Sequence, residues 1–253
     1  FEVGGGLATE EVTIPGFFHN THAIYHLMVD YAPLLKDFPI EEEYKVSFIH
    51  PELEWAMPLS DGKCLCIYRD VDKTCQSIAR FSQRDADSYR EMCHKFHEMV
   101  DSFLAPATYY PPSPAPLQAA QLEQTELGRA ITAISEKTPE EIVNELFEND
   151  IVRTLMLYVA CHWGLEYDGA GVSYLVPLLL DRATNYRLCK GGSHRLSNAL
   201  VKTILANGGL MQTSVLIKRI IVENGTAKGV ELEDGTKIEA AKAVVSTIDT
   251  HQT

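Results

Sequence analysis

An α/β fold, of the α+β kind with helices and strands in separate stretches, is predicted by two patterns in this 253-residue sequence. Apolar residues recur three and four positions apart through most of residues 71–163, which is typical of amphipathic helices. Apolar and polar residues alternate in residues 45–68 and 211–238, where Asp-Gly and Asn-Gly pairs indicate tight turns. A helical block combined with antiparallel hairpins follows from these patterns.

The overall composition excludes several classes of protein. A formal net charge of -13 argues against a nucleic-acid partner, because phosphate backbones are bound by clustered Lys and Arg. No apolar run reaches the length of about 18 residues that spans a bilayer. The six cysteines form no C-x-x-C pair, so a zinc site is not expected and a reduced, cytoplasmic setting is the simpler interpretation.

The first half of the chain is predicted to contain one short helix, a sheet and two longer helices. The apolar spacing from Ile24 gives a helix that ends near Tyr31, because Pro33 disfavours its continuation. Strands are expected at 45–49, 53–59 and 64–68, with a hairpin turn at 60–63, and helices at 71–81 and 85–103.

Residues 109–116 carry four prolines and are expected to be extended. They form either an interdomain linker or, as we favour, a loop inside a helical region, because helical patterns lie on both sides. Helices are predicted at 117–135, at 138–147 with Thr138 as N-cap, and at 150–163. The apolar run 172–180 contains Pro177 and is better suited to a pocket-lining helix than to a strand.

The last part of the chain is predicted to return to strands. A helix opens after Gly191-Gly192 and stops at Asn207-Gly208. Strands follow at 211–222, 226–232 and 237–238, and the run 243–246 is expected to be a buried strand.

Three stretches together resemble the phytoene-desaturase-like branch of the FAD-dependent oxidoreductases, which includes the carotenoid isomerases and the pyridine nucleotide-disulphide oxidoreductase domain 2 type proteins. The first runs from Glu2 to Glu11 with Pro15-Gly16-Phe17, and the second is 191–196. The third runs from Thr213 to Gly235 and on to Val244-Val245-Ser246-Thr247 and Asp249. Residues 78–90 resemble the domain 2 type proteins. The order and spacing of these stretches carry the resemblance.

The resemblance implies an FAD-dependent desaturase or dehydrogenase with a hydrophobic substrate. Residues 1–25 would be a remnant of a Rossmann-like FAD-binding domain. Residues 26–190 would form a mixed sheet and helical substrate-binding domain, with an antiparallel sheet and a helical lid, and 191–253 would be the returning helix and strands of the FAD-binding domain. Family members begin with a strand, a G-x-G-x-x-G loop and a helix that bind the pyrophosphate, and this sequence has no such motif. The sequence is therefore expected to be an internal part of an enzyme whose remaining polypeptide, or a partner chain, completes the flavin site.

The resemblance also assigns candidate site residues. The cofactor-binding positions are Gly4, Gly5, Gly6, Thr9, Glu10, Ile217, Ser246 and Thr247. The positions near substrate or flavin are Gly191, Gly192, Ser193 and His194. Each also has a plain structural interpretation: a flexible loop for the first three glycines, core packing for Ile217, a turn for Ser246 and Thr247, and a capped helix start for Ser193 and His194.

Other chemistries and functions remain open or are disfavoured. His19, His22 and His26 lack a neighbouring carboxylate that would complete a familiar ligand set, so no metal is expected. No G-x-S-x-G nucleophile motif occurs. The alternatives are a non-catalytic binding or assembly protein on the same scaffold, and a flavin-dependent isomerase or amine oxidase. Peripheral membrane contact and homo-oligomerisation stay open as well.

Overall fold

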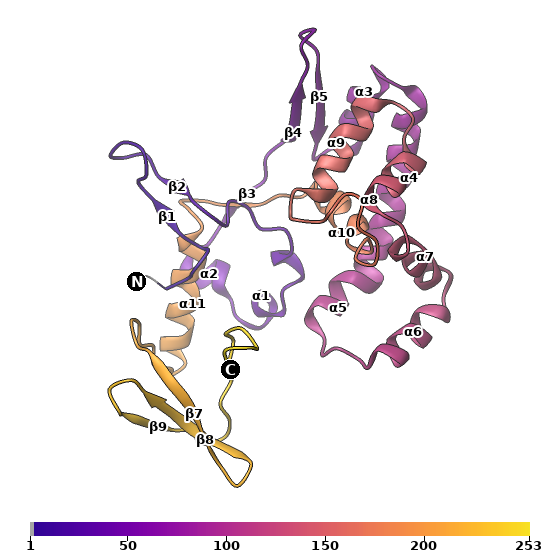
Figure 1. The fold of residues 1–253 in the computed structure, drawn as a ribbon. Coiled ribbons are helices and arrows are strands. Elements are labelled where there is room, and N and C mark those ends of the chain that lie inside the picture. Colours follow the sequence, from indigo (N-terminus) through magenta and orange to yellow (C-terminus); the bar gives the residue numbers. More distant parts are fainter. Residues whose placement is uncertain (1–2) are drawn as a thin grey trace. The chain divides into compact units, whose positions relative to one another are not determined.

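The computed structural model describes residues 3–253 as helices and small antiparallel sheets (Figure 1). The chain forms two compact units, one of residues Gly6–Ala199 and one of Leu200–Thr253 together with the residues up to Gly5. The mixed helix and strand content agrees with the predicted α+β class. Every strand pair in the described part of the chain is antiparallel, so the Rossmann-like domain stays a prediction. Glu2, where the first family-like stretch begins, lies outside the described residues.

The beginning of the larger unit differs from the predicted helix over 24–31. That segment is irregular except for a short 3-10 helix, and Pro33 opens the next helix instead of ending one. Proline suits a first helical position because its N–H would lack an intrahelical partner there. The elements are β1 (Thr9–Glu10), β2 (His19–Asn20), the 3-10 helix η1 (Val29–Tyr31), α1 (Pro33–Asp37) and α2 (Ile40–Tyr44).

The predicted hairpin is confirmed as β4 (Leu53–Pro58) and β5 (Cys64–Tyr68). The other edge of β5 is covered by α3 (Val71–Ala79): the Cys66 N–H donates to Ser77 Oγ at 2.9 Å and the Tyr68 N–H donates to Thr74 Oγ1 at 2.8 Å. Side-chain hydroxyls therefore take the place of a third strand. Of the strand predicted at 45–49, the structure has the last two residues as β3 (Phe48–Ile49), which pairs with β6 (Leu188–Cys189).

Helices form the rest of the larger unit. They pack around a core that includes Ile78, Tyr89, Met156 and Leu180, all fully buried. Burial of such side chains contributes roughly 1.5–3 kcal/mol each. The elements are α4 (Gln83–Met99), the π-helix η2 (Val100–Leu104), α5 (Ala105–Tyr109), α6 (Ala115–Glu123), α7 (Glu126–Ser135), α8 (Pro139–Leu146), α9 (Asp150–Cys161) and α10 (Leu175–Arg182).

The region from the proline-rich stretch to α7 differs in part from its prediction. The helix expected over 117–135 is broken into α6 and α7, because the Thr125 hydroxyl accepts a hydrogen bond from the Gly128 N–H and starts a new helix there. The backbone turns so tightly that a Cβ at Gly128 would lie 2.1 Å from the Leu122 carbonyl oxygen. The proline-rich stretch is extended only over 110–114 and lies within the larger unit, so the loop interpretation is confirmed.

A buried ion-pair network joins the segment before α1 to α10. The Arg182 side chain is almost fully buried, and its Nη2 donates to both Asp30 carboxylate oxygens, at 2.7 and 3.0 Å. Its Nε donates to the Leu27 carbonyl oxygen at 2.9 Å. Arg187 also pairs with Asp30, at 3.0 Å. These bonds hold an otherwise irregular segment against the helical core.

The smaller unit is a three-stranded meander of β7 (Ile217–Glu223), β8 (Thr226–Leu232) and β9 (Lys237–Glu239). Asn224 and Gly225 both have positive φ, as the predicted hairpin turn requires. The helix α11 (His194–Ala206) leads into this unit. The buried strand predicted at 243–246 is wrong: the segment is irregular and Val245 is 83% exposed. Both edges of β8 are already taken by β7 and β9, and no other described strand pairs with these residues.

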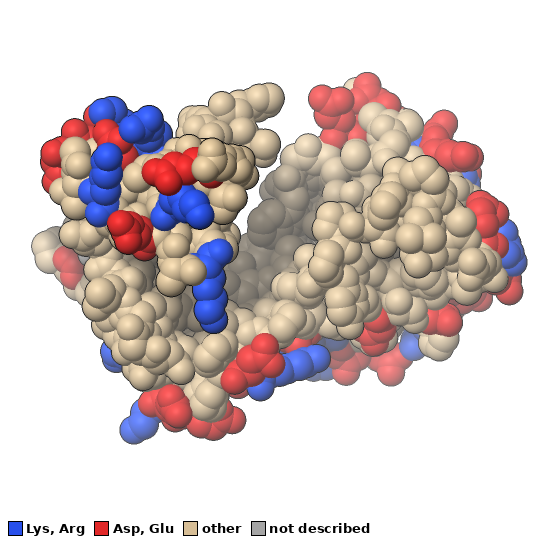
Figure 2. All heavy atoms as spheres, turned by 90° about the horizontal axis from the view of Figure 1, so that it is seen from below, with Lys and Arg blue, Asp and Glu red and all other residues tan. Residues whose placement is uncertain are grey.

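The face drawn in Figure 2 carries Lys and Arg side chains interspersed with Asp and Glu, between broad areas of uncharged side chains. Within residues 3–253 no helix has the length and apolar character needed to cross a membrane.

Candidate functional site

The glycine turn predicted before a helix is present at the start of α11. Gly191 and Gly192 have φ of +84° and +103°, a region that residues with a Cβ rarely adopt. The Gly192 N–H donates to the Cys189 carbonyl oxygen at 3.0 Å, which closes the turn. The turn directs the chain from β6 into the first residues of α11.

Two polar side chains from the β1–β2 pair cap this helix. Asn20 Oδ1 accepts a hydrogen bond from the Ser193 N–H at 2.9 Å, and Thr9 Oγ1 accepts one from the His194 N–H at 3.2 Å. Thr9 Oγ1 in turn donates to Asn20 Oδ1 at 2.9 Å. Thr9 and the 191–194 segment, two groups predicted from distant parts of the sequence, are therefore in direct contact. The contact that the structure gives Thr9 is a helix cap.

Gly192 lies so close to Thr9 that substitution has a specific expected effect. A Cβ at position 192 would lie 2.6 Å from Thr9 Oγ1, whereas a Cβ at Gly191 meets only ordinary contacts with Arg195. Gly191→Ala should therefore cost only the backbone strain, about 1–3 kcal/mol, and Gly192→Ala should cost more because Thr9 is also displaced. Urea denaturation of the two variants tests this difference. Equal losses of unfolding free energy in the two variants would contradict the close contact between Gly192 and Thr9.

The other predicted cofactor residues lie elsewhere. Glu10 is exposed and accepts a hydrogen bond from Thr21 Oγ1 at 2.9 Å. Gly4 and Gly5 have positive φ, and the Gly6 carbonyl oxygen accepts the Ala23 N–H at 2.9 Å. In the smaller unit Ile217 begins β7 and is 54% exposed, so its interpretation as a core residue is wrong.

Ser246 and Thr247 lie after the last strand, in an irregular segment. Ser246 Oγ is 2.9 Å from Thr253 Oγ1, and Thr247 is exposed. This geometry does not test the cofactor-binding role of Ser246 and Thr247 or that of the glycines at the start of the chain. Both roles remain predictions.

The polar groups at the α11 start decide how far this turn would suit a flavin nucleotide. His194 Nδ1 is buried without a hydrogen-bond partner among the described residues, 2.9 Å from the position that a Cβ at Gly192 would take, and Gly191 is exposed. However, the Ser193 and His194 N–H groups are already bonded to Asn20 and Thr9. Of these groups only the His194 ring nitrogen would be available to a cofactor, and the sequence lacks the G-x-G-x-x-G loop that binds the pyrophosphate in dinucleotide-binding folds.

Six aromatic side chains form a second feature, which sequence analysis did not predict. Their ring centroids lie 4.1–6.1 Å from one another in successive pairs, with edge-on, tilted and stacked geometries typical of attractive aromatic contacts. This aromatic cluster consists of Tyr25, Trp55, Tyr158, His162, Trp163 and Tyr186. The chain's two tryptophans both belong to it.

His162 is the polar centre of the aromatic cluster. Its Nε2 lies 3.0 Å from the Tyr25 hydroxyl and 3.5 Å from the Tyr186 hydroxyl, and Nδ1 lies 2.7 Å from the Val159 carbonyl oxygen. Burial lowers the pKa of His162 and raises the pKa of both Tyr25 and Tyr186. All three side chains are therefore uncharged at neutral pH.

Glu54 lies beside the aromatic cluster, next to Trp55 and the Tyr186 backbone. Burial raises the pKa of Glu54 to about 7, against the opposing effects of Arg69 and of the Tyr186 backbone. A carboxyl group that is half protonated near neutral pH can exchange a proton with a ligand, so this group is a candidate for acid-base chemistry.

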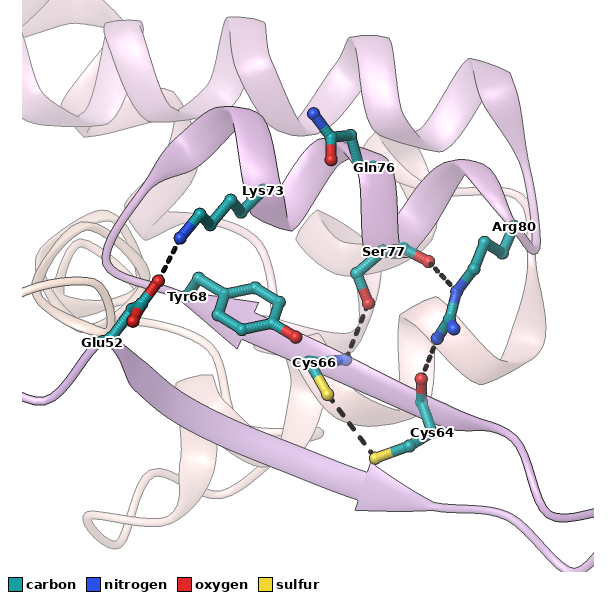
Figure 3. Close-up of a pocket in the computed structure, with 8 residues that line it drawn as sticks. All are labelled: Glu52, Cys64, Cys66, Tyr68, Lys73, Gln76, Ser77 and Arg80. Atoms are coloured by element: carbon teal, nitrogen blue, oxygen red, sulfur yellow. Dashed lines mark hydrogen bonds and ion pairs between the residues drawn. The ribbon is translucent and has the colours of Figure 1, made fainter.

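A shallow pocket of about 550 Å³ lies between β5 and α3 (Figure 3). Cys64 and Cys66, alternate residues of β5, have sulfur atoms 3.6 Å apart. Burial raises the pKa of the Cys64 thiol, which disfavours its reactive thiolate. The two cations of the pocket already have partners, since Lys73 pairs with Glu52 and Arg80 donates to the Cys64 carbonyl oxygen. The pocket contains none of the predicted site residues.

The three histidines near the start of the chain each have a hydrogen-bond partner or pack against another ring. His19 Nε2 is 2.9 Å from Thr13 Oγ1, His22 Nδ1 is 3.1 Å from Thr21 Oγ1, and the His26 ring packs on Phe48. Among residues 3–253 no group of three or more His, Cys, Asp or Glu side chains is arranged to hold a metal ion.

The known proteins that match the chain include a dehydrogenase subunit and a desaturase. The chain is similar to a limonene dehydrogenase subunit of Castellaniella defragrans, with 39% identity over 98% of this chain and 46% of that protein. It is also similar to a 4,4'-diapophytoene desaturase (4,4'-diapolycopene-forming) of a Methylomonas species, with 26% identity over 43% of this chain and 22% of the desaturase. No protein-family model matches the chain. The chain thus spans about half the length of the dehydrogenase subunit, and the similarity to a desaturase agrees with the resemblance found in the sequence.

Proposed function

We propose that this chain is part of an FAD-dependent oxidoreductase of the desaturase or dehydrogenase type that acts on a hydrophobic substrate. The observation that carries the proposal is the 39% identity to a limonene dehydrogenase subunit along almost the entire chain. The weaker similarity to a desaturase supports the same class of reaction. The resemblance of residues 2–17, 191–196 and 213–249 to the phytoene-desaturase-like family supports FAD as the cofactor.

Two groups of residues would serve this function. The Gly191-Gly192 turn and His194 would contact the flavin, because Gly191 is exposed and the nearby His194 Nδ1 is buried and unpartnered. The flavin would accept a hydride from the substrate, and the protein would orient both and exclude water. The aromatic cluster supplies the apolar surface that a hydrocarbon substrate needs.

The relative's name, which describes it as a subunit, supports a complex with a further polypeptide. We propose that the remaining part of the flavin site comes from sequence outside these 253 residues or from a partner chain. A non-catalytic binding or assembly protein is the second candidate. It is favoured by one observation: the Ser193 and His194 N–H groups at the start of α11, which could otherwise bind a cofactor, already donate to Asn20 and Thr9.

Flavin retention tests the proposal. The 253-residue chain alone should retain no FAD, and co-expression with the remaining polypeptide should give a complex with a flavin absorbance band. In that complex Gly191→Ala should weaken FAD retention. Gly208→Ala, at a glycine of similar φ that has nothing near its Cβ position, serves as the control for backbone strain. A stable complex without flavin would favour the assembly protein.

A further inference from the structure

Two cysteine thiols lie next to each other in the pocket between β5 and α3 (Figure 3). The Sγ atoms of Cys64 and Cys66 are 3.6 Å apart, and both side chains are half-buried. Alternation along β5 explains why they meet: Leu65 and Ile67 are buried in the core, so Cys64, Cys66 and Tyr68 share the opposite face. Both thiols therefore face the same pocket.

The neighbouring strand leaves this face of β5 accessible. On β4, Pro58 pairs with Cys64 and Ala56 pairs with Cys66, and both β4 residues are small and exposed. The pocket beside the thiols has a volume of about 550 Å³. A small ligand can thus reach both sulfur atoms from solvent.

Strand geometry favours an atom that bridges the two sulfurs over a direct disulfide. Alternate residues of a strand have Cα atoms about 6.6–6.8 Å apart, whereas most disulfides join Cα atoms about 5.5–6 Å apart. A metal–thiolate bond of about 2.3 Å, as in zinc sites, allows two sulfurs up to about 4.6 Å apart to share one ion. The observed separation of 3.6 Å lies within that reach.

The number of ligands selects among the ions that thiolates bind. Thiolates favour soft ions, Cu⁺ and Zn²⁺ among them. Zinc sites take three or four protein ligands, but the described lining of this pocket has two thiols and no histidine, and its Glu52 carboxylate is paired with Lys73. Cu⁺ has a closed shell and can be held by two thiolates alone, so it suits this pair.

The charges that line the pocket complement such a complex. Two thiolates and one Cu⁺ carry a net charge of about −1, by formal count. Lys73 and Arg80 face the single carboxylate of Glu52 in the pocket lining, which leaves one positive charge in excess. Burial raises the pKa of Cys64, and the Arg80 guanidinium, which donates to the Cys64 carbonyl oxygen, opposes that effect. A divalent ion on the same two thiolates would be neutral and would gain nothing from Arg80.

We propose that Cys64 and Cys66 together form a binding site for monovalent copper, with the two thiolates as its ligands. Two thiols and one Cu⁺ give a bis-thiolate anion and two released protons, and no atom changes its oxidation state. The proposal goes beyond the oxidoreductase function and involves neither a flavin nor a hydrocarbon substrate, so either can fail without the other.

Competition with bicinchoninate, a chelator that is coloured when it holds Cu⁺, tests the site in anaerobic solution with ascorbate as reductant. The 253-residue chain should remove one Cu⁺ per chain from the chelator. Cys64→Ser and Cys66→Ser should each weaken binding by about 100-fold or more, because even groups outside the ligand shell contribute up to that factor. Cys161→Ser, at a half-buried cysteine on α9, should retain the wild-type affinity. Unchanged affinity in either of the first two variants would overturn the proposal.

The released protons and the role of Arg80 give a second test. Affinity should rise by about 100-fold per pH unit while both thiols are protonated, because each must lose its proton to bind. Since burial raises the pKa of Cys64, the rise should continue above the ordinary thiol value of about 8.5. Arg80→Gln should weaken binding by about fivefold, and Arg80→Lys should restore most of it. An affinity independent of pH would contradict thiolate ligation.

X-ray absorption at the copper edge examines the wild-type chain and so does not depend on the folding of any variant. The copper-loaded protein should show two sulfur neighbours around the ion. Nitrogen or oxygen neighbours in their place would show that copper binds elsewhere and would overturn the site.

Discussion

Replacing Asp30 by alanine is expected to lower the free energy of unfolding by about 3–5 kcal/mol. Arg182 is 2% exposed and loses its bidentate partner in this variant, while Arg187 loses the same carboxylate. Only the more distant Asp181 carboxylate, 3.9 Å from Arg182 Nη1, would then face the buried guanidinium, which cannot recover the hydration it lost on folding. Urea denaturation at pH 7, followed by far-UV circular dichroism, measures the loss.

An exposed ion pair provides the control for this prediction. Lys137 and Glu145 are paired on the surface, with side chains 37% and 59% exposed. Glu145→Ala should therefore cost less than about 1 kcal/mol. If Asp30→Ala cost no more than Glu145→Ala, the buried network would contribute nothing beyond a surface pair.

Asp85→Ala is expected to destabilise the larger unit by about 3–5 kcal/mol, because two buried donors would lose their acceptor. Asp85 is fully buried in the first turn of α4, and its two carboxylate oxygens accept the N–H groups of Glu148 and Asn149 at 2.8 and 2.9 Å. These bonds fix the turn that leads into α9. Asn149 then caps that helix by accepting the Ile151 N–H.

Asp87 lies two residues later on the same helix and offers a matched substitution. It is exposed and accepts one hydrogen bond from Gln83 Nε2, at i,i+4 spacing. Asp87→Ala should cost no more than about 0.5 kcal/mol. Chemical denaturation of both variants under identical conditions gives the comparison, and similar midpoints would show that the carboxylate of Asp85 is dispensable.

Local signals predicted the elements that local interactions determine. Thr138 followed by Pro139 and Glu141 indicated a helix start, and the structure has a complete capping box there. Asn224-Gly225 indicated the β7–β8 turn. The break after α6 was missed although Thr125 is a good N-cap, because apolar spacing continues across it. The strand expected at 243–246 failed since pairing depends on a partner that no local pattern reveals.

The candidate sites were predictable to different degrees. The Gly191-Gly192 turn was found because positive φ has a direct signature in sequence. The contact between Thr9 and His194 joins residues 185 positions apart, and only the family resemblance placed both in one site. The aromatic cluster collects side chains between positions 25 and 186, so no spacing rule could assemble it. Glu54 was hidden for a further reason, since a bulge interrupts the alternation that assigns faces.

The Thr74 and Ser77 hydroxyls, which bind the outer edge of β5, affect the solubility of the protein. A two-stranded hairpin leaves one row of unpaired backbone groups on each side, and such rows can template the addition of strands from other molecules. Thr74 and Ser77 are almost fully buried and bind the Tyr68 and Cys66 N–H groups of that edge. Loss of both hydroxyls would therefore turn β5 into an open template for intermolecular β-aggregation.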